Sequence, residues 1–299
     1  MNNSLTKIRE RLRELDIKPS KGLGQNFLTS DSAYKKIIEA SEIRRGETIL
    51  EIGPGLGTLT EYLVEAGVKV VGLEKDRKLI SFLTELFSLN KSVTILEGDV
   101  LKINPYDFGL AENNYKVVAN IPYYITSRLL RTIFDSPANK WPKPKLVVLL
   151  VQREVAQRII AQPPHMNILA LSVQYFAQPK IIAKVPKGSF YPMPNVDSAI
   201  IKIVPNNQWV VDSETTKNFF KVIRIGFSSK RKKLINNLST GFKLDPAQSN
   251  SADRQQRGRT LSGTSKKTIE NILISIGVDP GARPENLTIQ QWQELAKEL

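Results

Sequence analysis

Short apolar runs alternate with amphipathic segments through the first two thirds of the chain. Runs rich in Val, Ile and Leu are typical of strands that are buried on both faces. Such runs predict strands at Thr48–Gly53, Lys69–Glu74, Val93–Glu97, Lys116–Ile121 and Leu146–Val151. Helical spacing between the runs predicts helices at Thr58–Ala66, Arg77–Ser88, Ser127–Asp135 and Gln152–Ile160. This alternation predicts an α/β fold with a parallel sheet covered by helices on both faces.

Two further strands are predicted at Lys180–Val185 and Ser198–Val204, after a short helix. The stretch between them is too short for a crossover connection, so we expect an antiparallel pair at the edge of an otherwise parallel sheet. No pattern in the sequence indicates an internal repeat.

The pattern changes after about Pro205, where helical spacing dominates. It predicts helices at Asp212–Gly226, Ser229–Leu238, Lys266–Ile276 and Thr288–Leu299. We therefore expect two domains, residues 1–205 and a small all-helical C-terminal domain of residues 206–299. The segment Ser249–Thr264 is polar and rich in Ser, Gln and Arg, so we expect a flexible loop there.

The charge balance points to a polyanionic partner. The 299 residues include 43 Lys and Arg against 29 Asp and Glu, a net charge of +14. Such an excess is typical of proteins that bind nucleic acid or an anionic membrane surface. No apolar run is long enough to span a bilayer, and Met1–Glu14 does not have the pattern of a signal peptide. We expect a cytoplasmic protein that binds nucleic acid rather than a membrane.

The composition also limits the chemistry. The chain contains no cysteine and one histidine, His165. It therefore has no thiol nucleophile, disulfide or Cys-based zinc site, and we expect neither a histidine-centred triad nor a metal site. Catalysis has to depend on carboxylates, amides, backbone groups, aromatic rings or a cofactor.

A glycine-rich loop follows the first predicted strand. It reads Glu51-Ile52-Gly53-Pro54-Gly55-Leu56-Gly57 and lies at the carboxyl end of a strand, where open α/β sheets bind ligands. Its spacing is G-x-G-x-G, whereas the dinucleotide fingerprint that places a pyrophosphate on a helix N-terminus is G-x-G-x-x-G. The loop resembles that of class I methyltransferases, whose cofactor, S-adenosyl-L-methionine, has no phosphate.

Two acids follow the next two strands. Glu74 ends the second strand, where a carboxylate can accept hydrogen bonds from both ribose hydroxyls, as it also does in dehydrogenases. Asp99 follows the third strand, where an acid could hold the adenine amino group. Each alone could be a turn or helix-capping residue. Together with the glycine loop they favour a methyltransferase.

The stretch Asn120-Ile121-Pro122-Tyr123 follows the fourth strand and suits methylation of an exocyclic adenine nitrogen. The lone pair of that nitrogen is delocalised into the ring, so its attack on a methyl group needs help. The side-chain oxygen of Asn120 and a backbone carbonyl, which we expect to be that of Pro122, can accept hydrogen bonds from its two N–H groups. Tyr123 offers a face for stacking. Positioning and electrostatics then make the main contributions to catalysis.

At this point the chain resembles the ribosomal RNA adenine dimethyltransferases, specifically the bacterial small-subunit (kasugamycin-sensitivity) enzymes. The resemblance covers nearly the whole chain and includes the loops described above. Further motifs that carry it are Lys21–Leu28 (KGLGQNFL), Gln152–Ala156 (QREVA), Phe190–Ala199 (FYPMPNVDSA) and the tail from Asp279-Pro280 to Arg283–Leu287. Tyr124 stands where other members often carry a smaller polar residue, and Ser249–Thr264 is longer than usual.

The resemblance implies roles for individual residues. It implies that the cofactor site is lined by Asn26, Leu28, Gly53, Glu74, Asp99 and Asn120. It implies that the target base is handled by Asn120, Pro122 and Tyr123, with Phe190 stacking on its other face. It also implies transfer of two methyl groups to each of two adjacent adenosines near the 3′ end of small-subunit (16S) ribosomal RNA, in assembling 30S particles.

Basic residues are the candidates for contacts with RNA phosphates. The densest cluster is Lys230-Arg231-Lys232-Lys233, at a predicted helix start, and it leads us to expect that the C-terminal domain binds RNA. Further candidates on predicted helices of the first domain are Arg128, Arg131, Arg153 and Arg158. The helically spaced Phe219, Phe220, Ile223 and Phe227 are predicted to form the core of the small domain.

Two other functions remain open on the sequence, and a third fails on the glycine spacing. The chain could be a non-catalytic RNA-binding factor of ribosome assembly, although the intact Asn120–Tyr123 loop argues against loss of catalysis. It could be a large-subunit methyltransferase of the antibiotic-resistance branch, although Gly24-Gln25-Asn26 and the tail favour the small-subunit branch. A nicotinamide dehydrogenase is disfavoured by the glycine spacing. We expect a monomer, because no feature suggests a self-complementary surface.

Overall fold

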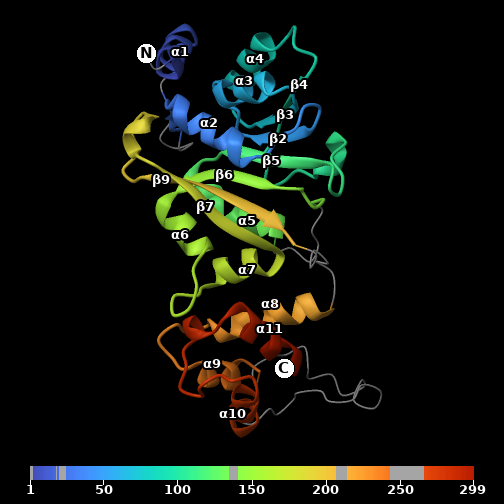
Figure 1. Cartoon of the computed structure of the whole chain (residues 1–299), viewed down its shortest axis with the longest axis vertical. Helices are drawn as coiled ribbons and strands as arrows, with labels where there is room; N and C mark the ends of the chain where they lie inside the picture. Colours follow the sequence, from blue (N-terminus) through green and yellow to red (C-terminus); the bar gives the residue numbers. More distant parts are fainter. Residues whose placement is uncertain (1–2, 18, 20–24, 135–140, 207–213, 243–265) are drawn as a thin grey trace. The chain divides into compact units, whose positions relative to one another are not determined.

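The computed structural model describes residues 3–17, 19, 25–134, 141–206, 214–242 and 266–299 (Figure 1). Lys21–Gly24 and Ser249–Thr264, both singled out in the sequence, lie outside the described residues. Within the described chain, contacts between Cα atoms define two compact units. The described residues of 1–134, 139–160 and 176–209 form the first unit, and those of 161–175 and 210–299 form the second.

A seven-stranded sheet forms the centre of the first unit, with the order β4-β3-β2-β5-β6-β9-β7. The strands are β2 (Thr48–Ile52), β3 (Lys69–Glu74), β4 (Val93–Glu97), β5 (Tyr115–Asn120), β6 (Val147–Gln152), β7 (Ala177–Val185) and β9 (Ser198–Pro205). The first five are parallel, whereas β9 is antiparallel to both β6 and β7. The mostly parallel α/β sheet and its antiparallel edge pair are therefore confirmed.

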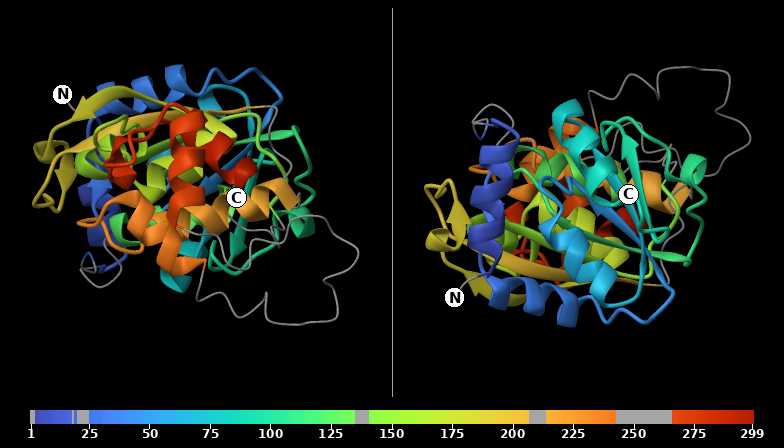
Figure 2. Two further views of the ribbon diagram at one scale, coloured as in Figure 1. Left: turned by 90° about the horizontal axis from the view of Figure 1, so that it is seen from below. Right: turned by 90° about the horizontal axis from the view of Figure 1, so that it is seen from above.

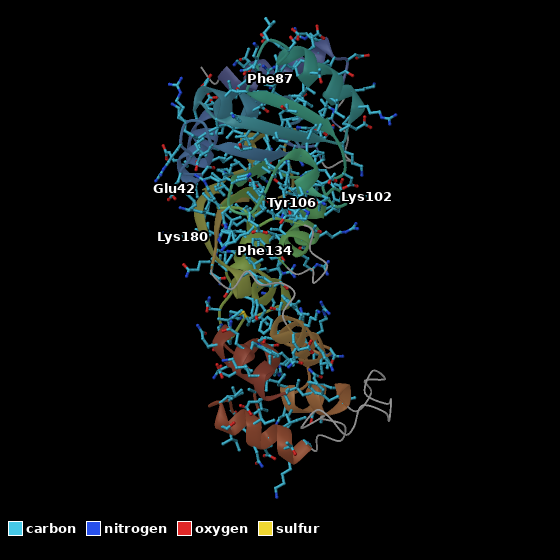
Figure 3. All side chains as sticks on the ribbon, turned by 90° about the vertical axis from the view of Figure 1, so that its right-hand side faces the viewer. Glu42, Phe87, Lys102, Tyr106, Phe134 and Lys180 are labelled. Carbon is cyan, nitrogen blue, oxygen red and sulfur yellow. The ribbon has the colours of Figure 1, made fainter. Side chains whose placement is uncertain are left out.

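Helices cover both faces of this sheet (Figures 1 and 2). The α-helices described in this unit are α1 (Asn3–Glu14), α2 (Asp31–Ala40), α3 (Thr58–Glu65), α4 (Arg77–Leu86), α5 (Thr126–Phe134) and α6 (Arg153–Ile159). Helices α2 and α3 share one buried core cluster with alternate strand residues such as Ile49, Val118 and Val148. On the other face, α5 ends at Phe134, which is completely buried and is labelled in Figure 3. Burial on both faces explains why the strands read as continuous apolar runs.

The N-terminal part contains elements that the apolar pattern did not predict. Helices α1 and α2 precede the first predicted strand, and β1 (Phe27–Leu28) pairs antiparallel with β8 (Phe190–Tyr191) in a separate two-stranded sheet. Ile8 and Leu12 of α1 join a second core cluster with Leu56 and Leu79. These contacts connect segments that lie far apart in the sequence, so no local periodicity reports them.

The second unit is helical in its described part, which confirms the expected all-helical C-terminal domain. Its α-helices are α7 (Ile168–Phe176, of which the last residue belongs to the first unit), α8 (Glu214–Gly226), α9 (Leu234–Gly241), α10 (Lys266–Ser275) and α11 (Ile289–Glu298). The predicted core residues Phe219, Phe220, Ile223 and Phe227 are all buried. The prediction of a helix from Ser229 was wrong, because α9 begins at Leu234 and the preceding Lys233 is extended, with ψ of 144°. Four successive cations would oppose the partial positive charge of a helix N-terminus.

The expected division into residues 1–205 and 206–299 differs from the compact units in two respects, of which the smaller is that Asn206 belongs to the first unit. Residues 161–175 belong to the helical unit. The ring of Tyr175 stacks on Phe219 with centroids 4.2 Å apart and meets Phe220 edge-on at 5.9 Å. The backbone N–H of Met166 also donates to the carbonyl of Glu285 at 3.1 Å. Long-range aromatic packing, which no break in composition marks, thus adds this segment to the second unit.

Candidate functional site

A pocket of about 460 Å³ opens in the first unit, at the carboxyl ends of the parallel strands β2, β3 and β5. The predicted site residues that line it are Asn26, Leu28, Gly53, Glu74, Asp99, Asn120, Pro122 and Tyr123. The sequence therefore identified residues from five separate segments that the fold brings to one cavity. Phe190 does not line this pocket and is 4% exposed within the core cluster under α2.

The glycine loop forms one wall of the pocket. Gly53 and Gly55 have φ angles of 68° and 61°, a left-handed conformation that favours glycine. A Cβ added at Gly53 would have no atom within 4 Å, so this backbone faces open space on its free side. Gly57, with φ of 76°, is the N-cap of α3. The loop thus exposes backbone to a ligand instead of covering it with side chains.

Backbone N–H groups hold the carboxylate of Glu74 at the end of β3. Its Oε2 accepts from Gly55 N at 3.0 Å, and its Oε1 accepts from Lys75 N at 2.8 Å and Asp76 N at 3.0 Å. The residue is 8% exposed. A carboxylate offers about four acceptor positions, so Glu74 keeps capacity on Oε2 for a ligand hydroxyl after these three bonds form.

Asp99 follows β4, the strand next to β3, and also lines the pocket. Its Oδ1 accepts from Leu101 N at 3.1 Å, and its Oδ2 pairs with the Lys75 ammonium at 3.0 Å. Partial burial favours the neutral acid, but the Leu101 N–H and the Lys75 charge outweigh it and lower the pKa of Asp99 below its ordinary value. Asp99 is therefore an ionised acceptor at neutral pH, suited to an amino group.

Asn120 ends β5 with its side chain oriented by a distant backbone group. Its Nδ2 donates to the carbonyl of Asn26 at 3.4 Å. That contact directs the amide nitrogen towards Asn26 and leaves Oδ1 as an acceptor. The carbonyl of Pro122 already accepts from Ile125 N at 3.2 Å, which closes the 3₁₀ helix η2 (Tyr123–Ile125), and its second lone pair remains available.

Tyr123 is fixed at its hydroxyl end. The Tyr123 hydroxyl and the hydroxyl of Ser198, which is completely buried, are 2.6 Å apart. Burial raises the pKa of Tyr123 above its ordinary value despite this hydrogen bond, so the phenol stays neutral. The ring is therefore held in place as an apolar face, not as a base.

Two features of the site escaped the sequence patterns. Arg11 of α1, 9% exposed, donates from Nη1 to the carbonyl of Leu56 in the glycine loop at 2.7 Å and pairs through Nη2 with Glu61 at 2.6 Å. Ile8, on the same helix, lines the pocket. No motif marks these residues. An amphipathic pattern over 3–14 was the available signal, and it predicts a helix but not its target.

Glu51, noticed in the sequence only as the acid before the glycines, also lines the pocket and is 1% exposed. Burial raises its pKa to about 8, against the hydrogen bond from the Thr60 hydroxyl at 2.7 Å and with a smaller contribution from the charge of Glu74. Glu51 is therefore mostly protonated at neutral pH.

Replacing Glu51 by glutamine is expected to flatten the pH dependence of stability. Between the ordinary pKa of 4.5 and about 8, the folded chain keeps a proton on Glu51 that the unfolded chain releases. The free energy of unfolding of the wild type thus falls as pH rises through this window, by about 2 kcal/mol between pH 6 and pH 8. Urea unfolding of both proteins at these pH values measures the difference. If the free energy of unfolding of Glu51→Gln fell by the same amount between pH 6 and pH 8, the raised pKa of Glu51 would be contradicted.

The basic residues singled out in the sequence have different surroundings. Lys230–Lys233 are all exposed directly before α9. Arg128 is exposed and lines the pocket, whereas the Nε of Arg153 is buried without a hydrogen-bond partner among the described residues. No cluster of three or more His, Asp or Glu side chains suitable for a metal ion occurs in the described part of the chain. Of its helices, none is long and apolar enough to cross a membrane.

The hydrogen-bonding groups that line the pocket fit a nucleoside cofactor. Glu74 and Asp99 present acceptors for hydroxyl and amino groups, and the glycine loop leaves room for close approach. The volume of about 460 Å³ lies within the range of cofactor sites. The same pocket also contains Asn120, Pro122 and Tyr123.

Comparisons with known proteins agree on one family. A family model described as ribosomal RNA adenine dimethylase matches residues 17–293. The chain is 37% identical to the ribosomal RNA small subunit methyltransferase A of Dehalococcoides mccartyi (strain CBDB1), over 98% of this chain and 93% of the relative. It is 36% identical to the protein of the same name from Halothermothrix orenii, over 97% of this chain and 91% of the relative.

Solved structures agree with this match. A dimethyladenosine transferase from Plasmodium falciparum is similar with a TM-score of 0.73 and 26% identity, over 90% of this chain and 95% of that chain. The 23S rRNA methyltransferase ErmE has a TM-score of 0.68 at 22% identity, over 92% of this chain and 99% of that chain, and shares the fold.

Proposed function

The chain belongs to the ribosomal RNA adenine dimethylase family, and on this premise we propose that it transfers methyl groups from S-adenosyl-L-methionine to N6 of two adjacent adenosines near the 3′ end of small-subunit ribosomal RNA. One observation carries the proposal: a single pocket contains both Glu74 and Asp99, the acids that we expect to hold a nucleoside, and the Asn120–Tyr123 loop. We further propose that the enzyme acts as a cytoplasmic monomer on assembling 30S particles.

Bound S-adenosyl-L-methionine would supply an electrophilic methyl group on a sulfonium. The residues of this chain that would hold it are Glu74, at the ribose hydroxyls, and Asp99, at the adenine amino group. The glycine loop and the Asn26–Leu28 segment complete the walls. Because Glu74 and Asp99 are fixed by backbone N–H groups, binding needs little reorganisation of either carboxylate.

The target nitrogen would be activated by acceptors rather than by a base. Asn120 Oδ1 and the Pro122 carbonyl would accept hydrogen bonds from the two N–H groups of adenine N6. These bonds favour the tetrahedral geometry that the nitrogen needs for attack. Tyr123 would stack on the ring of the base. The surplus proton can leave to water after the methyl group has moved, so no strong base is needed. The stacking role of Phe190 stays a prediction, since the residue is buried in this structure.

Substrate RNA would reach the pocket with its target base splayed out of the helix, as enzymes acting on a base require. The net charge of +14 supplies the general attraction to phosphates. The exposed Lys230–Lys233 cluster of the helical unit is the best local candidate for such contacts.

Neutralising Arg231 and Lys232 together with glutamine is expected to weaken RNA binding about tenfold at moderate salt and to reduce the slope of log K against log salt by about two. Filter binding of small subunits at several salt concentrations measures both. The control is Lys297→Gln, because Lys297 is exposed in the same unit but pairs with Glu294 at 2.7 Å. An unchanged slope in the double variant would remove the cluster from the RNA-binding surface.

The proposed activity is tested with small subunits that lack the dimethyl marks. Incubation with radiolabelled S-adenosyl-L-methionine, followed by nucleoside analysis, should yield labelled N6,N6-dimethyladenosine. Tight subunit binding without label would instead support the assembly-factor alternative. Label on large-subunit RNA would support the proposed methyl transfer but show that the substrate is the large-subunit RNA.

A further inference from the structure

The mouth of the pocket carries an exposed aromatic ring that the proposed chemistry does not use. Tyr124, the second residue of η2, is 59% exposed and lines the same pocket as Asn120 and Tyr123. Successive residues of a 3₁₀ helix are about 120° apart. Tyr123 therefore points inwards to Ser198 while its neighbour faces solvent.

Two cations line the same pocket as this ring. They are Arg128, which is exposed, and Lys75, whose side chain is 62% exposed. Lys75 pairs with Asp99, and the Tyr124 hydroxyl is close enough to act electrostatically on the lysine. An exposed ring next to cations is the combination with which proteins hold single-stranded nucleotides, the ring stacking on a base and the cations contacting phosphates.

We propose that Tyr124, Arg128 and Lys75 form a second nucleotide site at the pocket mouth. There the ring of Tyr124 stacks on the base next to the flipped adenine, and the two cations contact the flanking phosphates. This inference rests on the proposed function, because it needs an RNA substrate. It deepens that function by explaining how one pocket can treat two adjacent adenosines in turn: while one base occupies the pocket, its neighbour is held at the mouth.

The ring of Tyr124 is tested by a pair of variants. Tyr124→Ala should raise the KM for small subunits about tenfold, within the range that loss of one base–aromatic stack gives. It should leave the affinity for S-adenosyl-L-homocysteine and the first methyl transfer at saturating substrate within about threefold of wild type. RNA methylated on only one of the two adenosines should accumulate. Tyr124→Phe, which keeps the ring, should behave like wild type.

Stacking itself is measured without turnover. The probe is an RNA hairpin with two adjacent adenines in its loop, one of them replaced by the fluorescent base 2-aminopurine. Binding of the wild type and of Tyr124→Phe should quench 2-aminopurine at the position outside the pocket, and binding of Tyr124→Ala should leave it bright.

Two results would overturn the inference. One is that Tyr124→Ala quenches 2-aminopurine as strongly as the wild type and has an unchanged KM for small subunits. The other is that Tyr124→Phe loses as much quenching and affinity as Tyr124→Ala. If the wild type itself forms no dimethyladenosine, the proposed function fails instead.

Discussion

Replacing Asn120 by alanine is expected to slow methyl transfer by about two to three orders of magnitude, the usual effect of removing one oriented polar group from a reacting centre. The side chain lies at the end of β5, and its Nδ2 contact with the Asn26 carbonyl presents Oδ1 as the acceptor. Alanine removes that acceptor and leaves only the Pro122 carbonyl to favour the tetrahedral geometry of the adenine nitrogen. Single-turnover rates at saturating cofactor and subunits separate this effect from weaker binding.

Asn120→Asp is the matched variant. It keeps an acceptor oxygen but loses the N–H donor that meets Asn26 at 3.4 Å. We expect it to retain more activity than alanine and less than the wild type. Circular dichroism should show the wild-type fold in both variants. If Asn120→Ala kept more than a third of the wild-type rate, activation by Oδ1 would be wrong, and the pocket would function mainly by positioning.

The central sheet could be predicted because its signal is local. Strands buried on both faces appear as runs such as Val117–Ala119 or Val147–Val151, and each lies between recognisable helices. The site residues could be predicted for a related reason. Glu74, Asp99 and Asn120 each stand at or just after the carboxyl end of a parallel strand, and the topology of such a sheet brings these ends to one edge.

Most of the missed features depend on contacts that no short window of sequence contains. Arg11 bonds to Leu56, which lies 45 residues further along the chain. Strand β1 pairs with β8, which comes near the other end of the sequence of the first unit. Helix α2 did have a local signal, since Ser30 caps it by accepting from Ala33 N at 3.3 Å. The second unit gives another example. Tyr175 packs with that unit by stacking on Phe219, a contact between residues that are far apart in the sequence.

Protonation states were also beyond the sequence. Glu51 and Glu74 are both acids beside the glycine loop, yet they differ in partners. Glu74 accepts three backbone N–H bonds, whereas Glu51 accepts a bond from the Thr60 hydroxyl. Burial, which the sequence does not report, keeps the proton on the Glu51 carboxyl near neutral pH by raising its pKa. This difference makes Glu74 the more informative position for a test of cofactor binding.

Replacing Glu74 by glutamine is expected to weaken cofactor binding by about two orders of magnitude, since hydrogen bonds to a charged acceptor contribute more than neutral ones. An amide has one acceptor oxygen, while the native carboxylate takes Gly55 N on one oxygen and Lys75 N and Asp76 N on the other. The amide NH₂ therefore has to face at least one backbone N–H or displace it. The orientation with NH₂ facing Gly55 N distorts the glycine loop, the other distorts the turn at Lys75 and Asp76, and both remove acceptor capacity for the ribose hydroxyls.

Titration calorimetry with S-adenosyl-L-homocysteine measures the loss directly, and Glu97→Gln is its control. Glu97 pairs with Glu74 in the register of β3 and β4, so it occupies the corresponding end of the next strand. Its side chain is 53% exposed, bonds to Arg77 at 2.8 Å and does not line the pocket. We expect Glu97→Gln to bind within about twofold of the wild type, because exposed ion pairs contribute little. Equal affinities for all three proteins would show that the cofactor ribose does not depend on the acid at the end of β3.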